Sequence, residues 1–368
     1  MTVTDALSPV SPRPERTLTR TESARQTRSF TELAQTVRGL GLNNRTPRFY
    51  WALFAGLLVA LAGALAGMVL LRDSWWQLLI ALALAVIFTQ FAFLGHEASH
   101  RQVLASGPAN DRFGRILANV FVGISYQWWM SKHTRHHGNP NKVGRDPDIA
   151  PGVVSFTTED AEESTGMRRW FTRRQGWLFF PLLAFVGLDL HQASIRSLFA
   201  RGPVAGRGIE LGMLAARFAV YFALVFWAMP LGLAFAFLGV QFAAFGVYMG
   251  ASFAPNHIGM PIVPANSRLS FLDKQVLTSR NVSGGWFMTA LMGGLNYQIE
   301  HHLFPSMPRP HLWKARQLVQ EHCAEHGVPY TETNLARALG IVVAHMNRVG
   351  LAAAREFRCP TAGVMGRG

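Results

Sequence analysis

Long stretches without charged residues alternate with polar stretches along the chain. The first stretch covers residues 49–71, and a second, 75–95, follows after a short polar turn. A third block, 211–256, has Arg217 as its only charge and divides near Pro230. A helix as long as the first stretch rises roughly 34 Å, enough to cross a bilayer core. The pattern predicts an all-α polytopic membrane protein with four transmembrane helices in two hairpins, at about 49–71, 75–95, 211–229 and 231–254.

A shorter apolar segment, residues 176–190, lies between the two predicted hairpins. Pro181 interrupts it and Asp189 marks its end, so the uninterrupted part is too short to cross a bilayer. We therefore predict that this segment lies at the membrane interface. His191 follows directly, and we interpret it as a surface residue, with support of a metal ligand as the alternative.

The polar ends of the chain predict two less compact parts. Residues 1–44 are rich in Ser, Thr, Arg and Pro, which is typical of a disordered tail, and they offer no apolar core for a secretory signal. From about Pro305 the chain alternates apolar and charged residues with helical spacing, and we expect a helical cytosolic cap. The predicted shared face of the cap comprises Leu312, Ala315, Leu318, Val319 and His322. The expected divisions are a tail over 1–44, a membrane domain over 45–330, and a C-terminal helical cap and tail over 331–368.

Composition supports the membrane class. Hydrophobic residues make up 49% of the chain and charged residues only 15%, whereas soluble proteins carry about a quarter charged residues. The net charge of +14 suits either nucleic acid or an anionic membrane surface, and only the membrane also explains the apolar stretches. Two cysteines without a CxxC pair exclude a thiolate metal site and an iron–sulfur cluster.

Histidines gather beside the apolar stretches with spacings that place them on one helical face. One histidine alone is more often a capping or surface residue, but three dense clusters are not explained in that way. Eight histidines exceed the roughly four ligands of one tetrahedral metal, so the pattern predicts two metal ions. Imidazole binds iron, copper, nickel and zinc, which leaves the metal open. The clustered residues are His96 and His100, then His133, His136 and His137, then His301 and His302, with His257 after the last apolar block.

The predicted hairpins bring all these histidines to one side of the membrane, because each hairpin returns the chain to the side it left. The arginine-rich tail and loops place this side in the cytosol, since the opposite turns are short and carry no net positive charge. We expect a multi-pass protein of the cell membrane with its active site and both termini on the cytosolic side.

The boxes HEASH, HTRHH and QIEHHLFPSMPR, with the run PNKVGRDPDI at 140–149, resemble those of the membrane-bound fatty acid desaturases. Glutamine at the start of the third box is similar to the front-end and linoleoyl-type branch and to bacterial acyl desaturases. The resemblance covers about residues 45–330. It implies an O2-dependent enzyme that uses a di-iron centre to introduce a cis double bond into an acyl chain, as acyl-CoA or acyl-lipid. The box spacing alone does not exclude a hydroxylase or ketolase acting on alkane, sterol or carotenoid.

The resemblance also assigns residue roles. It implies direct metal ligation by His96, His100, His133, His136, His137, His257, His301 and His302. Gln298 stands where some relatives have histidine, and its amide is expected to bond a metal-bound water more readily than the metal itself. Asn256 is assigned a similar water-mediated role. Asp146, Asp148, Glu97 and Glu300 are candidate acceptors for ligand ring N–H groups, with ordinary capping or loop carboxylates as the alternative.

Electrons must reach such a centre from a donor. The sequence has no HPGG haem signature and no GxGxxG fingerprint, so we expect a separate carrier of the ferredoxin, flavin reductase or cytochrome b5 type. A basic cytosolic face suits an acidic carrier. A polytopic metal transporter is the alternative from another functional class. It is disfavoured because the histidines flank the apolar stretches, which hold almost no polar residues to line a pathway.

Overall fold

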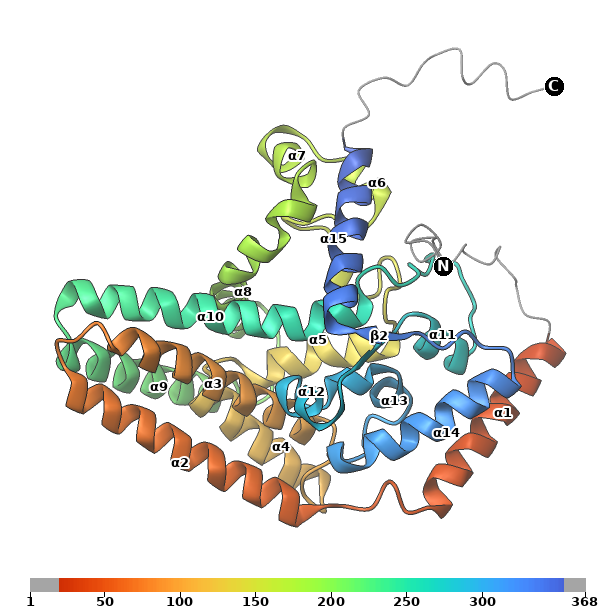
Figure 1. Cartoon of the computed structure of the whole chain (residues 1–368), viewed down its shortest axis with the longest axis horizontal. Coiled ribbons are helices and arrows are strands. Elements are labelled where there is room, and N and C mark those ends of the chain that lie inside the picture. Colours follow the sequence, from red (N-terminus) through yellow and green to blue (C-terminus); the bar gives the residue numbers. More distant parts are fainter. Residues whose placement is uncertain (1–19, 354–368) are drawn as a thin grey trace.

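The computed structural model describes residues 20–353. Four long apolar helices agree with the predicted segments, and Figure 1 shows them extending to the same side of the molecule. They are α2 (Pro47–Leu71), α3 (Gln77–Ser99), α9 (Arg207–Ala228) and α10 (Leu231–His257). Pro47 occupies the first turn of α2, where its missing N–H costs no helical hydrogen bond. Most of the apolar face of α2 is exposed, as expected for a helix that contacts lipid.

A further helix, α8 (Gln175–Phe199), corrects the predicted length of the segment at 176–190. Pro181 removes one backbone hydrogen bond without ending the helix, and Asp189 lies on an exposed face. With α8, the described residues hold five helices long and apolar enough to cross a membrane. The four-span arrangement therefore stays a prediction, although Figure 1 shows α8 crossing α10 steeply instead of running alongside it.

Two glycines allow α8 and α10 to cross at close range. A Cβ atom on Gly187 of α8 would lie 2.7 Å from the carbonyl oxygen of Phe242 on α10, and a Cβ on Gly246 of α10 would meet backbone atoms of α8. Helix backbones approach this closely only where side chains are absent. The crossing holds α8 against the second half of α10, the half that ends at His257.

Part of the predicted disordered tail is helical. Residues Arg20–Gly39 form α1, and the buried Leu33 and Val37, four residues apart, pack against α14 (Leu312–Glu325). These apolar residues form a narrow face in an otherwise polar segment. Helix α1 is stable because this face packs against α14. The predicted tail residues 1–19 lie outside the described part of the chain.

The remaining elements gather around the histidine-bearing ends of the long helices (Figure 1). The residues predicted to share one helical face lie on α14, where Leu312, Ala315 and Val319 are buried and Leu318 and His322 half-buried. A short parallel pair, β1 with β2, joins the segment before the third box to the chain after α14. These elements are α4 (Gly107–Ile116), the π-helical η1 (Leu117–Val122), α5 (Tyr126–Gly138), η2 (Pro147–Ile149), α6 (Thr158–Glu162), α7 (Gly166–Thr172), α11 (Phe271–Leu277), β1 (Asn281–Ser283), α12 (Gly285–Leu291), η3 (Leu295–Tyr297), α13 (Gln298–Leu303), η4 (Arg309–His311), β2 (Glu332–Asn334) and α15 (Leu335–Ala352).

Candidate metal centre

Five histidines from three elements meet where α3 ends. His96 and His100 come from the last turn of α3 and the residue after it, His133 and His137 from one face of α5, and His301 from α13. One ring nitrogen of each lies within 4.8 Å of the others. The closest pairs of Nε2 atoms are His100 with His133 at 2.7 Å, His96 with His133 at 3.0 Å, and His137 with His301 at 3.1 Å. We call this group the five-histidine cluster.

Three further histidines form a second group beside it. His136 of α5, His257 at the end of α10 and His302 of α13 also present ring nitrogens within 4.8 Å of one another. The rings of His137 and His302 stack at 4.2 Å between centroids and join the two groups. We call this second group the three-histidine cluster. The structure thus brings together all eight histidines that the sequence singled out, as two adjacent sets of nitrogen donors.

The Nδ1 atoms of the three-histidine cluster are held by protein acceptors. His257 Nδ1 lies 2.9 Å from the carbonyl oxygen of Thr278, and His302 Nδ1 lies 3.0 Å from Oε1 of Gln275. Because these oxygens accept hydrogen bonds only, each Nδ1 carries the proton and each Nε2 keeps a free lone pair. Gln275 is fixed in turn, since its amide nitrogen donates to the carbonyl of His137.

Asp146 orients the third ring of that cluster. His136 Nδ1 lies 3.1 Å from both carboxylate oxygens of Asp146, which also accept from the backbone N–H groups of Asn141 and Asp148. Burial opposes a charge on His136, but the carboxylate of Asp148 and the hydrogen bond to Asp146 raise the pKa of its ring above the usual value. Two of the four carboxylates predicted to contact a histidine ring therefore do so, because Asp146 and Asp148 both lie next to His136 Nδ1.

The donor set fits metal ions. Two metal–nitrogen bonds of roughly 2.1 Å at right angles would separate neighbouring nitrogens by about 3.0 Å, close to the Nε2 separations in the five-histidine cluster. His302 Nε2 is buried and has no hydrogen-bond partner within the described residues. Burial lowers the pKa of His137 and His302, with neighbouring histidines adding to the effect, which favours the neutral rings that a metal ion requires.

Gln298 and Asn256 lie beside the three-histidine cluster. The amide nitrogen of Gln298 is 2.8 Å from His257 Nε2, and Asn256 Nδ2 is 3.2 Å from Gln298 Oε1. A half-turn of the Gln298 amide would exchange its nitrogen for its oxygen and direct an acceptor to the same place. Gln298 therefore lies directly against His257 Nε2, and Asn256 holds the Gln298 amide from behind.

The other two predicted carboxylates contact no histidine ring. Glu97 forms a buried two-pronged ion pair with Arg309, at 2.7 and 2.6 Å. Glu300 accepts from Asn281 at 2.7 Å and from the hydroxyl of Tyr330 at 2.8 Å. Burial raises the pKa of Glu300 to about 7, against the effect of these hydrogen bonds. Each carboxylate points away from the neighbouring histidine because adjacent helical residues face different directions.

His191 is not the predicted surface residue. It is buried, with Nδ1 2.5 Å from the carbonyl of Gly187 and Nε2 3.2 Å from the carbonyl of Val122. Gly123, at φ +92°, leaves room for the ring, since a Cβ there would lie 3.2 Å from Nε2. His191 belongs to neither histidine cluster.

Sequence reasoning missed the acceptors Thr278 and Gln275. Both lie in the polar stretch before the third box, and nothing in their spacing links them to histidines elsewhere in the chain. Arg309 carried a weak signal, because it lies inside the conspicuous QIEHHLFPSMPR run. Its partner could not be inferred, since the ion pair joins segments more than two hundred residues apart.

We expect Asp146→Asn to weaken metal binding by about 10–100-fold. The carboxylate of Asp146 accepts hydrogen bonds from the His136 ring and from two backbone N–H groups. The asparagine amide offers only one acceptor oxygen for these three donors. Metal retention during titration with a chelator measures the effect. Asp160→Asn, which alters an ion pair with Arg168 outside the centre, is the matched control. Equal retention by both variants would contradict the role of Asp146.

The fold and the donor set together define a helical membrane protein with two adjacent histidine clusters at one end of its apolar helices. The chain belongs to the fatty acid desaturase family, whose model matches residues 73–334.

Individual relatives agree with this family. The chain is 28% identical to Delta(8)-fatty-acid desaturase 2 of Arabidopsis thaliana, over 74% of its length and 63% of the relative's. It is 30% identical to Delta(6)-fatty-acid desaturase fat-3 of Caenorhabditis elegans, over 82% and 70%. It is 29% identical to an acyl-lipid (9-3)-desaturase of Physcomitrium patens, over 75% and 54%. The chain thus spans between about half and seven tenths of these relatives' lengths.

Proposed function

We propose that the protein is an O2-dependent fatty acyl desaturase that introduces a cis double bond into an acyl chain, presented as acyl-CoA or acyl-lipid. The observation that carries the proposal is the meeting of eight histidines in two adjacent clusters at one end of the apolar helices. Membership of the fatty acid desaturase family and the names of the similar proteins support it.

The eight histidines are proposed to hold two iron ions, with Gln298 and Asn256 bordering the three-histidine site. When bound, such a centre supplies the activation of O2 needed to remove hydrogen from an unactivated methylene. Two hydrogens from the acyl chain, with two electrons and two protons from a donor, reduce O2 to two waters. The chain's own residues orient the imidazoles through Asp146, Thr278 and Gln275.

Burial also suits the site to this chemistry. Desolvation lowers the pKa of His100 to about 3 and that of His133 and His301 well below the usual value. Neutral rings remain available as ligands across the physiological range. The same exclusion of water protects a reactive centre from side reactions.

We further propose that electrons come from a separate redox protein of the ferredoxin, flavin reductase or cytochrome b5 type. The net charge of +14 supports docking of an acidic carrier at the cytosolic face. The proposed topology has α2, α3, α9 and α10 crossing the cell membrane, α8 at its cytosolic interface, and the histidine clusters and both termini in the cytosol. The direction of α8 across α10 in Figure 1 supports this topology.

Expression in a host that lacks the activity, followed by mass spectrometry of its lipids with location of double bonds, tests the function. We expect acyl chains that have lost two hydrogens, and their head groups identify the acyl carrier. A product that has gained one oxygen atom would instead identify a hydroxylase or ketolase. Metal uptake into vesicles without oxygen consumption would identify a transporter and overturn the proposal.

A further inference from the structure

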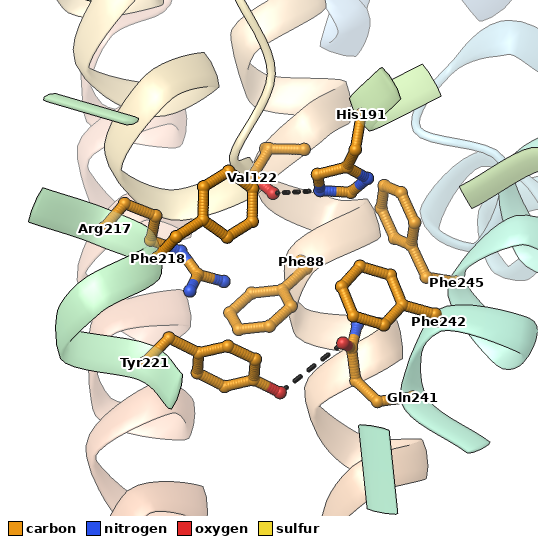
Figure 2. A pocket seen from close by; sticks show the side chains of 9 residues that line it. All are labelled: Phe88, Val122, His191, Arg217, Phe218, Tyr221, Gln241, Phe242 and Phe245. Atoms are coloured by element: carbon orange, nitrogen blue, oxygen red, sulfur yellow. Dashed lines mark hydrogen bonds between the residues drawn. The ribbon is translucent and has the colours of Figure 1, made fainter. Parts of the chain in front are cut away.

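A pocket separate from the histidine clusters lies among α3, α8, α9 and α10, beside the end of η1 (Figure 2). Its enclosed volume is about 10 Å³, which is room for one oxygen-sized atom, and its mouth is open. Most of its wall is aromatic, and Tyr221 and Gln241 contribute a hydroxyl and an amide that bond each other at 3.4 Å. The metal centre uses none of these residues.

Arg217 of α9 places a positive charge in this pocket. Its guanidinium lies over the rings of Tyr221, at 4.3 Å from the centroid, and Phe88, at 4.9 Å. Figure 2 shows the guanidinium directed toward the ring of aromatic side chains. Nη1 is buried and has no hydrogen-bond partner in the part of the chain that the structure describes. Aromatic rings stabilise the cation but accept no strong hydrogen bond, so the site has a donor in need of an acceptor.

The neighbourhood of Arg217 indicates where that acceptor comes from. Glu210, two turns earlier on α9, is buried and bonds Arg115 and the hydroxyl of Ser125, which marks a polar layer. Seven residues of helix separate the two Cα atoms by about 10 Å. Arg217 therefore lies about two turns from this polar layer, and the described residues supply no acceptor for its Nη1. Because α9 is long and apolar enough to cross a membrane, lipid is the neighbour that can supply one.

The outer surface of α9 indicates the chemistry of the rest of the ligand. Val220 and Trp227 are 69% and 64% exposed on this apolar helix, and in a membrane protein such a surface contacts acyl chains. A lipid group that enters the pocket therefore needs an anionic head to satisfy Arg217 and an apolar chain to lie against the surrounding helices. A neutral lipid supplies the chain but leaves the charge uncompensated.

We propose that this pocket binds the oxyanion head of a lipid, either a fatty acid carboxylate or a phospholipid phosphate, with Arg217 as its charged donor. Guanidinium and oxyanion form charge-assisted hydrogen bonds, which are stronger in surroundings of low dielectric. The inference depends on the pocket alone and is independent of the reaction at the histidines.

Native mass spectrometry of the full-length, metal-loaded protein in a phosphate-free maltoside detergent tests the proposal. The probes are palmitate and dioleoyl-phosphatidylglycerol, each titrated alone. We expect wild-type protein to retain at least one probe, and Arg217→Gln to bind it at least about tenfold more weakly. Retention of palmitate only identifies a fatty acid site, and retention of phosphatidylglycerol only identifies a phospholipid site.

Two further variants sharpen the test. Arg174→Gln is the matched control, because Arg174 also stacks on an aromatic ring, that of Trp170 at 4.5 Å, but is exposed to solvent; it should bind like wild type. Arg217→Lys keeps the charge without the planar fork, so its binding should fall by less than that of Arg217→Gln, and it decides the matter if Arg217→Gln does not fold. Wild-type protein that retains neither probe, or Arg217 variants that bind as tightly as wild type, would overturn the proposal.

Discussion

Replacement of His302 by alanine is expected to abolish double-bond formation, with a loss of at least about 1,000-fold. His302 Nε2 is a buried donor without a protein partner, and its ring also stacks on His137. Removal of one member of a catalytic group that acts as a unit costs about as much as removal of the whole group. Iron content should fall in parallel, because the three-histidine cluster would keep only two rings.

The measurements are iron per chain by elemental analysis and unsaturated product per chain after expression in a host that lacks the activity. His311→Ala is the matched control, since His311 lies outside both clusters and its Nδ1 donates to the carbonyl of Leu42. This control should keep wild-type iron and product. If His302→Ala also keeps both, the proposed ligand set is wrong.

The second large effect concerns stability. Arg309→Met should lower the free energy of unfolding by about 3–5 kcal/mol, because it leaves the buried Glu97 carboxylate without its partner. Arg309 and Glu97 are both about 95% buried or more, and the backbone N–H of Arg309 also donates to the hydroxyl of Tyr50. The pair therefore joins the third histidine box to α2 and α3.

Thermal unfolding in detergent, followed by a conformational probe, measures this loss. Arg316→Met breaks a partly exposed pair with Glu332 and should cost only about 0–1 kcal/mol, which makes it a suitable comparison. The double variant Glu97→Gln with Arg309→Met should recover part of the stability, since no charge stays unpaired. Equal losses for Arg309→Met and Arg316→Met would show that burial of the ion pair has no energetic importance.

The long helices and the histidine clusters could be predicted because their signals are local. An uncharged stretch such as 49–71 has one stable conformation in a bilayer, and the spacing of His133, His136 and His137 is meaningful on any helix. The length of α8 could not be predicted in this way. Pro181 is a sequence signal for interruption, but the packing of Gly187 against α10 outweighs the loss of one backbone hydrogen bond.

Contacts between residues far apart in the sequence could not be predicted either. The helix at Arg20–Gly39 is stabilised by α14, almost three hundred residues later, so its own composition predicted disorder. Glu97 and Glu300 were assigned to histidine rings because they adjoin histidines in sequence. Their actual partners, Arg309 and the pair Asn281 and Tyr330, depend on how α3, α13 and β1 pack.

The arrangement of α5 has one more consequence. A single turn of this helix directs His133 and His137 to one cluster and His136 to the other. Because one turn contributes donors to both clusters, a shift of α5 against α3, α10 and α13 would disturb the two proposed iron sites together.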